Sequence, residues 1–150
     1  MTEVLFYHLT ESRLEEALPD LLQRSLARGW RVVVQCRSVE RRDALDHVLW
    51  TFRDDSFLPH GTDAEDAAER QPILLTTRAD QNGNAPDVRF MVDGATAQDL
   101  GRYTRAVYMF DASDEEQMLH ARSRWTSEKA AGHALTYWQQ ADDRRWIKKA

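Results

Sequence analysis

The chain has 150 residues, of which 42% are hydrophobic and 30% are charged, and its formal net charge is −5 at pH 7. This length predicts one domain, spanning 1–150, with a core of its own. No apolar run approaches the ~20 residues that cross a bilayer, so we expect no membrane contact. The acidic balance argues against a whole-surface grip on nucleic acid, although it is compatible with a local basic patch.

The first predicted elements alternate between strand and helix. β-branched and aromatic residues predict a strand over 3–9, and leucines at helical spacing predict the helix that follows it. Pro19 lies inside that helix and should kink it or mark a restart, and Gly29 should close it. The near-continuous apolar run over 31–36 predicts a strand that is covered on both faces.

Local patterns predict the middle of the chain in the same way. Ser38 is a suitable N-cap for a helix over 39–52. The acidic stretch 61–71 predicts a solvated loop or a short helix. The further elements are strands over 73–77, 88–92 and 105–110, a turn of low order over 78–86, and a short helix over 96–100.

The last long helix has a clear predicted start. Ser113 and Glu116 form a capping box, and the helix should run to about Ala131, with Gly132 ending it. The remainder, 135–149, is aromatic and charged. We expect an ordered tail that packs on the domain, because exposed tryptophans are costly.

The alternation of elements predicts an α/β fold with a Rossmann-like, mostly parallel sheet of about five strands flanked by helices. Such a sheet is typical of nucleotide binding, which needs glycines after the first strand. The loop 8–12 has no glycine and carries Glu11, and the turn 37–39 has none either. The five histidines lack metal-ligand spacing, and no catalytic motif is present. We therefore expect no catalytic residue, no metal and no cofactor.

The single cysteine, Cys36, cannot form an internal disulfide, and the N-terminal residues lack the basic region and cleavage site of an export signal. We therefore expect a reducing cytoplasmic location. Cys36 lies in a valine-rich strand, which favours a buried structural thiol over a nucleophile.

Residues 45–61 are the most informative stretch. One face of the predicted helix is apolar: Leu45, Val48, Leu49 and Phe52. Trp50 points away from that face, roughly 140° round from its first member. Asp54 and Asp55 should stop the helix, and Pro59 forces an extended backbone that leaves Phe57 on a loop. Trp50 and Phe57 either close over each other as a satellite cluster or form a docking patch for another protein.

The last long helix carries a second candidate site. Met118, Arg122 and Trp125 follow one another at spacings of four and three, and Arg124 and Lys129 lie beside this stripe. Trp125 is either a core residue or part of a ligand site. Arg122 favours the ligand site, because arginine is rarely buried unpaired. Cations around an aromatic floor suit an acidic peptide with an aromatic end.

Several short motifs occur in one order along nearly the whole chain: Phe6-Tyr7-His8-Leu9, residues 29–34 (GWRVVV), Leu49-Trp50-Thr51-Phe52, residues 56–61 (SFLPHG), residues 71–75 (QPILL), Tyr137-Trp138-Gln139-Gln140 and Trp146. This ordered set resembles the chi subunit of bacterial DNA polymerase III, a clamp-loader accessory protein. The resemblance implies a non-catalytic subunit of the replicative polymerase holoenzyme. The alternative is a small nucleotide- or nucleic-acid-binding enzyme on a Rossmann-like sheet.

The resemblance also implies two partners, with DNA contacted only indirectly. The psi subunit, or an equivalent clamp-loader component, would dock near Trp50, Phe57, Leu58, Pro59 and His60. The acidic C-terminal tail of single-stranded DNA-binding protein would bind on the last helix.

On that helix, Arg122 and Trp125 fall on the family's arginine and aromatic positions. Met118 stands where the family often has a lysine. Arg124 or Lys129 would have to compensate for that lost charge.

Overall fold

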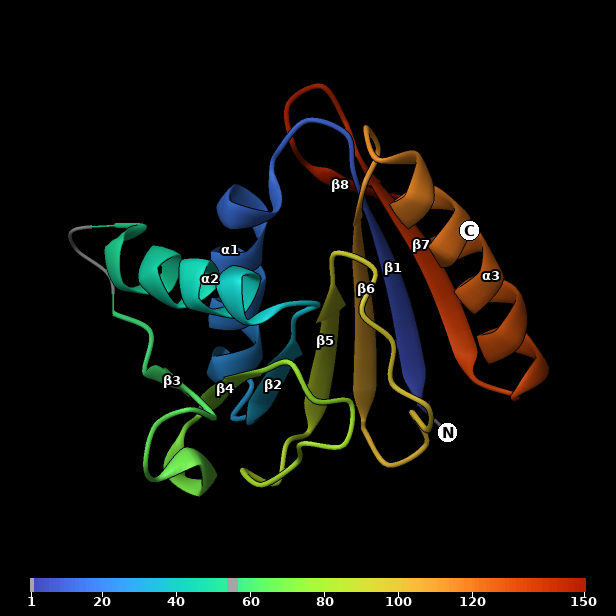
Figure 1. Cartoon of the computed structure of the whole chain (residues 1–150). Helices are drawn as coiled ribbons and strands as arrows, with labels where there is room; N and C mark the ends of the chain where they lie inside the picture. Colours follow the sequence, from blue (N-terminus) through green and yellow to red (C-terminus); the bar gives the residue numbers. More distant parts are fainter. Residues whose placement is uncertain (1, 54–56) are drawn as a thin grey trace.

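A computed structural model of the chain describes residues 2–53 and 57–150. Within them one sheet of eight strands is combined with three α-helices and a short 3₁₀ helix (Figure 1). The strands are β1 (Glu3–Leu9), β2 (Val32–Gln35), β3 (His60–Thr62), β4 (Ile73–Thr76), β5 (Val88–Val92), β6 (Arg105–Asp111), β7 (Ala134–Gln140) and β8 (Trp146–Lys148). The helices are α1 (Leu14–Ala27), α2 (Val39–Thr51), α3 (Glu115–Ala130) and the 3₁₀ helix η1 (Ala68–Arg70).

The strand order is β3-β4-β2-β5-β6-β1-β7-β8, and every neighbouring pair is parallel except β7 with β8. The predicted α/β class and mostly parallel sheet are confirmed. The expected number of about five strands is wrong. Those five form the centre of the sheet, and β3, β7 and β8 extend its two edges. β3 and β8 have only three residues each, and β7 is mostly half-buried and partly polar, so none gives a strong hydrophobic signal.

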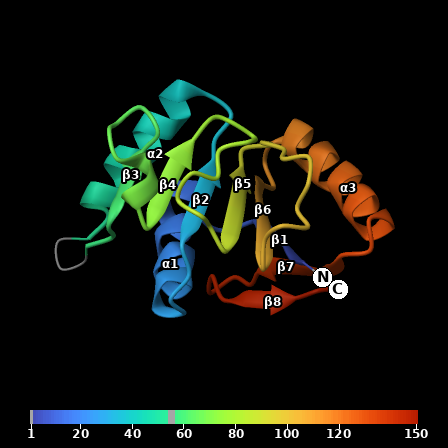
Figure 2. The ribbon, with the colours of Figure 1, turned by 90° about the horizontal axis from the view of Figure 1, so that it is seen from below.

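Successive residues of the central strands point to opposite faces of the sheet, so their side chains belong to two separate cores. On β1, Leu5 and Leu9 belong to the core that α1 and α2 complete with their leucines. Val4 and Phe6 belong to the second core, into which α3 packs. α3 lies at the other end of the molecule from α2 and β3, as both ribbon views show (Figures 1 and 2).

The predicted start of the chain is confirmed in most details. α1 is one continuous helix with the buried Pro19 inside it, so the proline does not mark a restart. Gly29 follows the last turn with φ of 80°, a conformation that glycine adopts without steric cost, and its N–H bonds the carbonyl of Leu26 at 2.9 Å. Ser38 caps α2, because its Oγ accepts from the Arg41 N–H at 3.1 Å.

Two local helix predictions are wrong. Residues 96–100 form no helix; they have no regular secondary structure and include a bend at Gln98, with Leu100 buried in the second core. The N-cap of α3 is Asp114, whose Oδ1 accepts from the Gln117 N–H at 3.1 Å. The hydroxyl of Ser113 donates instead to Asp111 at 2.8 Å. Aspartate and serine are almost equally good N-caps. Because the two residues are adjacent, the sequence placed the N-cap of α3 one residue too early.

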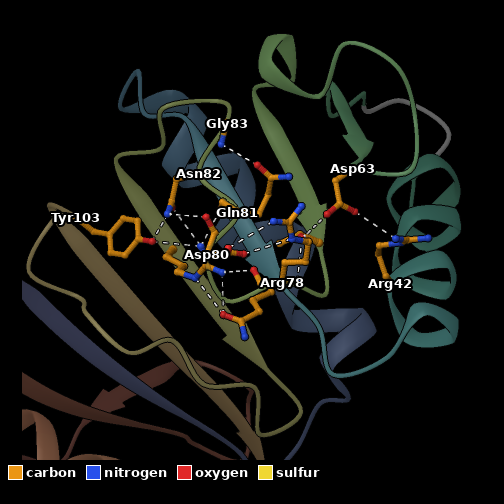
Figure 3. A network of polar contacts seen from close by, with 11 residues as sticks. Arg42, Asp63, Arg78, Asp80, Gln81, Asn82, Gly83 and Tyr103 are labelled. Carbon is orange, nitrogen blue, oxygen red and sulfur yellow. Dashed lines mark hydrogen bonds and ion pairs between the residues drawn. The ribbon is translucent and has the colours of Figure 1, made fainter.

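Residues 78–86 are ordered rather than loose, because a network of polar contacts ties them to the sheet (Figure 3). Arg89 of β5 is fully buried. Its guanidinium donates to the carbonyls of Arg78 at 2.8 Å and Gln81 at 3.0 Å, and to Oδ1 of Asn82 at 3.2 Å. The turn-forming residues of this segment predicted low order. Their composition does not indicate that an arginine on the next strand binds them.

The C-terminal segment is ordered, as predicted. It forms β7, which pairs with β1, and β8, which returns along β7. The indole of Trp146 packs edge-on against Tyr7, with ring centroids 4.7 Å apart. The stretch 61–71 was expected to be a solvated loop or a short helix, and it contains the short helix η1. It also contains most of strand β3, which was not predicted.

Candidate functional site

The first candidate site, called here the Trp50 patch, consists of the side chains of Trp50 and Phe57. Trp50 is 53% exposed and Phe57 is 66% exposed, and their ring centroids lie 5.7 Å apart. The apolar face of α2 is buried through Leu45 and Leu49, which leaves Trp50 on the other side as expected. The two rings therefore touch each other without covering each other. Asp54 and Asp55, predicted to stop the helix, lie outside the described residues.

The other residues of this loop lie beneath the patch. Leu58 is 2% exposed and His60 is 6% exposed, whereas Pro59 is half-buried. The His60 ring lies 4.5 Å from the Trp50 ring, centroid to centroid. Trp50 and Phe57 are therefore the exposed residues of this loop region, and the buried Leu58 and His60 lie beneath them.

His60 fixes the loop to α2. Its Nδ1 lies 2.6 Å from the carbonyl oxygen of Leu58, and its Nε2 lies 3.1 Å from the carbonyl oxygen of Asp46. The carboxylate of Asp46 is also 3.2 Å from Nε2. Both ring nitrogens thus lie within hydrogen-bond distance of an oxygen acceptor, one on the loop and one on the helix, and a neutral ring donates to one of them. This arrangement holds Phe57 close to Trp50.

A buried ion pair makes a second connection between α2 and the edge of the sheet. Figure 3 shows Arg42 of α2 pointing at Asp63, which follows β3, and their charged atoms are 3.2 Å apart. Asp63 also accepts from the hydroxyl of Thr76 on β4 at 2.5 Å. The helix that carries Trp50 is therefore fixed to the strand that follows the Phe57 loop.

The second candidate site is a cavity of about 500 Å³ between α3 and the sheet, called here the Arg122 cavity. Its apolar lining comes from β1, β6 and α3: Phe6, Phe110, Met118, Ala121 and Trp125. The remaining lining residues are Arg122, Thr126, Tyr137 and Ala150. Three residues of the predicted stripe, Met118, Arg122 and Trp125, thus lie together in one concave site.

Trp125 is at once part of the second core and part of the cavity wall. Its ring meets Phe6 edge-on at 5.2 Å and Tyr137 edge-on at 6.1 Å. One side of the indole packs against these aromatics, and the residue stays half-buried because the other side borders the cavity. The two alternatives for Trp125 are therefore compatible.

Arg122 is exposed at the cavity rim, and its guanidinium makes no ion pair or hydrogen bond with any described residue. It is the one lining residue with a charged side chain. Burial raises the pKa of the Tyr137 hydroxyl above its ordinary value, and the positive charge of Arg122 opposes part of that rise. An apolar cavity with a free cation at its rim fits an apolar group joined to an anion.

The two other basic residues of the helix lie elsewhere. Arg124 donates to Glu128 at 2.8 Å and to the hydroxyl of Tyr108 at 3.3 Å, and it does not line the cavity. Glu128 is buried, so Arg124 is needed to neutralise it. Lys129 is exposed near the end of α3 and is not part of the cavity lining either.

Phe6, Phe110 and Tyr137 line the cavity, although no sequence pattern placed them in a candidate site. Phe6 and Phe110 lie on predicted strands, and Phe6 pairs in register with Tyr137 of β7. Only recognition of β7 as the partner of β1 would have placed Tyr137 beside the helix.

The buried thiol of Cys36 has a pKa raised by burial to about 12, as expected for a structural cysteine. No group of three or more histidine, cysteine, aspartate or glutamate residues within 2–53 and 57–150 could hold a metal ion. None of the helices in these residues is long and apolar enough to span a bilayer.

Comparison with known proteins gives a family match. The model of the family described as DNA polymerase III chi subunit, HolC, matches residues 1–136. The chain is 35% identical over 79 residues to the DNA polymerase III subunit chi of Pseudomonas aeruginosa, an alignment covering 50% of this chain and 54% of that protein. It is 25% identical over 85 residues to the probable DNA polymerase III subunit chi of Rickettsia prowazekii, covering 57% and 52%.

A third relative is matched over a greater length. The chain is 23% identical over 124 residues to the DNA polymerase III subunit chi of Escherichia coli, an alignment covering 83% of this chain and 84% of that protein. The chain thus spans about half the length of the two relatives named above it and most of the third. The family match includes Trp50, Arg122 and Trp125 and ends just before Tyr137. This chain belongs to the DNA polymerase III chi subunit family.

Proposed function

We propose that this chi-family protein is a non-catalytic adaptor that links the clamp loader to DNA coated with single-stranded DNA-binding protein. The observation that carries the proposal is the guanidinium of Arg122, which lies at the rim of an aromatic cavity and makes no ion pair or hydrogen bond with any described residue. Helix α3, which carries Arg122, lies at the opposite end of the molecule from α2, which carries the exposed Trp50 (Figure 1). Two separate surfaces allow two partners to bind at once.

The Arg122 cavity would take the acidic C-terminal tail of single-stranded DNA-binding protein. An aromatic side chain at the end of that tail would fill the space beside Trp125 and Met118. The terminal carboxylate would pair with Arg122, because a guanidinium forms charge-assisted hydrogen bonds with carboxylates. Met118 adds apolar surface and no charge. Lys129 would act from a distance, on acidic residues further back in the tail.

The Trp50 patch would take the psi subunit or an equivalent clamp-loader component. Large aromatic side chains that project from a surface are typical anchors of protein interfaces, and they contribute through burial in a pocket of the partner. Trp50 and Phe57 project side by side, and Leu58 and His60 hold them from below. Pro59, half-buried between them, would lie at the border of the interface.

An adaptor of this kind acts by raising local concentration. If one partner holds the polymerase and the other coats the template, the second binding event becomes intramolecular and gains an effective concentration in the millimolar range for short connections. DNA is then contacted only through its coating protein, which agrees with the formal net charge of −5.

A pull-down with full-length and tail-truncated single-stranded DNA-binding protein tests the cavity. The full-length protein should be retained and the truncated protein should not. Leu119→Ala is a matched control, because Leu119 is 57% exposed on α3 and does not line the cavity. Equal retention of the two proteins would refute the tail as the ligand.

The same preparation tests the rival assignment as a small nucleotide-binding enzyme. Equilibrium dialysis against nucleoside triphosphates should show no binding in the micromolar range. Saturable uptake of a nucleotide would favour the enzyme over the adaptor.

A further inference from the structure

The hydroxyl of Tyr137 is a second polar group at the Arg122 cavity. Among the lining residues, Thr126 also carries a hydroxyl, but it donates to the backbone carbonyl of Arg122 at 3.3 Å. Tyr137 lies on β7, across the cavity from α3, and its oxygen is 2.8 Å from Nδ1 of His8 on the neighbouring strand β1. The direction of that hydrogen bond decides whether Tyr137 can donate to a ligand.

His8 is a buried residue behind the cavity wall. It is 9% exposed, and its ring stacks on Phe110 with centroids 4.9 Å apart and planes 14° apart. Its Nε2 is buried and has no hydrogen-bond partner among the described residues. Burial lowers the pKa of His8, and the nearby Asp111 carboxylate opposes that shift. The ring therefore favours its neutral form, with one hydrogen on one nitrogen.

The unpartnered Nε2 selects between the two neutral forms. A hydrogen on Nε2 would be a buried N–H without an acceptor, which is rarer and more costly than an unused acceptor lone pair. With the hydrogen on Nδ1, His8 donates to the oxygen of Tyr137. The hydrogen of the Tyr137 hydroxyl is then free to be donated into the cavity.

We propose that Tyr137, oriented by His8, is the second donor to a terminal carboxylate bound beside Arg122, and that it selects ligands with a free C-terminus. The inference rests on the proposed function and names the part of the peptide that the cavity recognises. A neutral hydroxyl on the sheet would thus supply a contact that Met118 on the helix does not.

The test uses two synthetic peptides of one acidic sequence ending in phenylalanine, one with a free carboxylate and one with a C-terminal amide. Titration calorimetry should give the wild-type chain a clear preference for the carboxylate. Tyr137→Phe should bind the carboxylate peptide about tenfold more weakly and the amide peptide almost unchanged, because a charge-assisted hydrogen bond is lost from only one of them. Tyr7→Phe, which removes a hydroxyl on the other face of β1, should behave as the wild type.

His8 is tested as a positioning residue. His8→Leu should reduce the preference for the carboxylate as Tyr137→Phe does, because nothing then orients the hydroxyl. His8→Asn should restore it, since its amide N–H can donate to the same oxygen. Thermal unfolding of each variant checks the fold. If His8→Leu does not fold, Tyr137→Phe decides the outcome.

Three results would count against the inference. An unchanged carboxylate-to-amide ratio in Tyr137→Phe would overturn it while leaving the proposed function intact. Tighter carboxylate binding by folded His8→Leu would also overturn it, because the hydroxyl would then have been donating to His8. Failure of the wild-type chain to bind either peptide would overturn the proposed function and this inference together.

Discussion

The Trp50 patch and the Arg122 cavity differ in shape and in charge. The patch is two projecting apolar rings, one from the end of α2 and one from a loop. The cavity is concave, with walls from three strands and one helix and an exposed guanidinium at its rim. A projecting ring gains its energy by entering a partner's pocket, whereas a cavity gains it by receiving a ligand group. The difference predicts an apolar contact at one end of the molecule and a charge-assisted contact at the other.

The two sites are also supported differently. The patch depends on His60 and on the pair of Arg42 with Asp63, which are contacts at the edge of the sheet. The cavity is built on β1 and β6 near the centre of the sheet and on β7. Changes that loosen the sheet edge should therefore weaken one partner and leave the other unaffected.

The largest effect should come from Trp50→Ala. Removing a central aromatic anchor costs about 2–4 kcal/mol of binding, so affinity for the psi subunit or the clamp-loader component should fall by a factor of about 30 to about 900. Because Trp50 is 53% exposed, the free energy of unfolding should fall by no more than about 1 kcal/mol. Calorimetry with the partner and urea unfolding of the chain measure the two quantities.

Val39→Ala is the matched control for this prediction. Val39 is 49% exposed on the same helix, at the far end from Trp50. Its replacement should change neither quantity appreciably. Loss of folding in Trp50→Ala would show that the indole is a core residue.

Arg122→Ala should have the next largest effect. Loss of a charge-assisted hydrogen bond costs about 1.5–3 kcal/mol, and the loss should appear in titration with the tail peptide. Stability should hardly change, because the guanidinium makes no ion pair with any described residue. Arg124→Ala provides the contrast: it should lower stability, since it leaves the buried Glu128 unpaired, and should leave tail affinity nearly unchanged. If Arg124→Ala weakened tail binding and Arg122→Ala did not, the tail would bind on the side of α3 that carries Arg124.

His60→Ala tests the support of the patch. The substitution removes the imidazole that lies between the carbonyl oxygens of Leu58 and Asp46, and the loss of a buried hydrogen bond there costs about 1–3 kcal/mol of stability. Affinity for the clamp-loader partner should fall by less than in Trp50→Ala, because the rings remain but Phe57 is less well held. Hydrogen exchange of residues 57–62 should become faster. Unchanged exchange there would mean that His60 does not secure the loop.

Sequence patterns predicted the central part of this fold well. The long apolar strands β1 and β6, and the valine-rich β2, follow from composition, and Ser38 and Gly29 correctly bound two helices. The edge strands were missed for a physical reason. Strand β3 is His-Gly-Thr, and its burial comes from tertiary contacts that no local pattern encodes.

The candidate sites were predictable in part. Trp50 was identified because it opposes the apolar face of its own helix, and Met118, Arg122 and Trp125 because they share a stripe. Tyr137 was missed as a site residue, since its place beside the cavity depends on the pairing of β7 with β1. The sequence placed Arg124 beside the stripe, as a residue that could compensate for the missing lysine, and the structure pairs it with Glu128 instead.

The smallest expected effect, and the most direct comparison of the two sites, is the response to salt. Raising ionic strength from about 50 mM to about 500 mM shortens the Debye length from roughly 14 Å to roughly 4 Å and weakens exposed charge pairs by up to about 1 kcal/mol. Tail affinity should therefore fall severalfold. The Trp50 patch offers two apolar rings, so affinity for the clamp-loader partner should stay constant or rise slightly. Arg122→Ala supplies the control, because it should remove part of the salt dependence of tail binding. If both partners respond equally to salt, the two contacts do not differ in their chemistry, and the assignment of a charge-assisted site to the cavity is wrong.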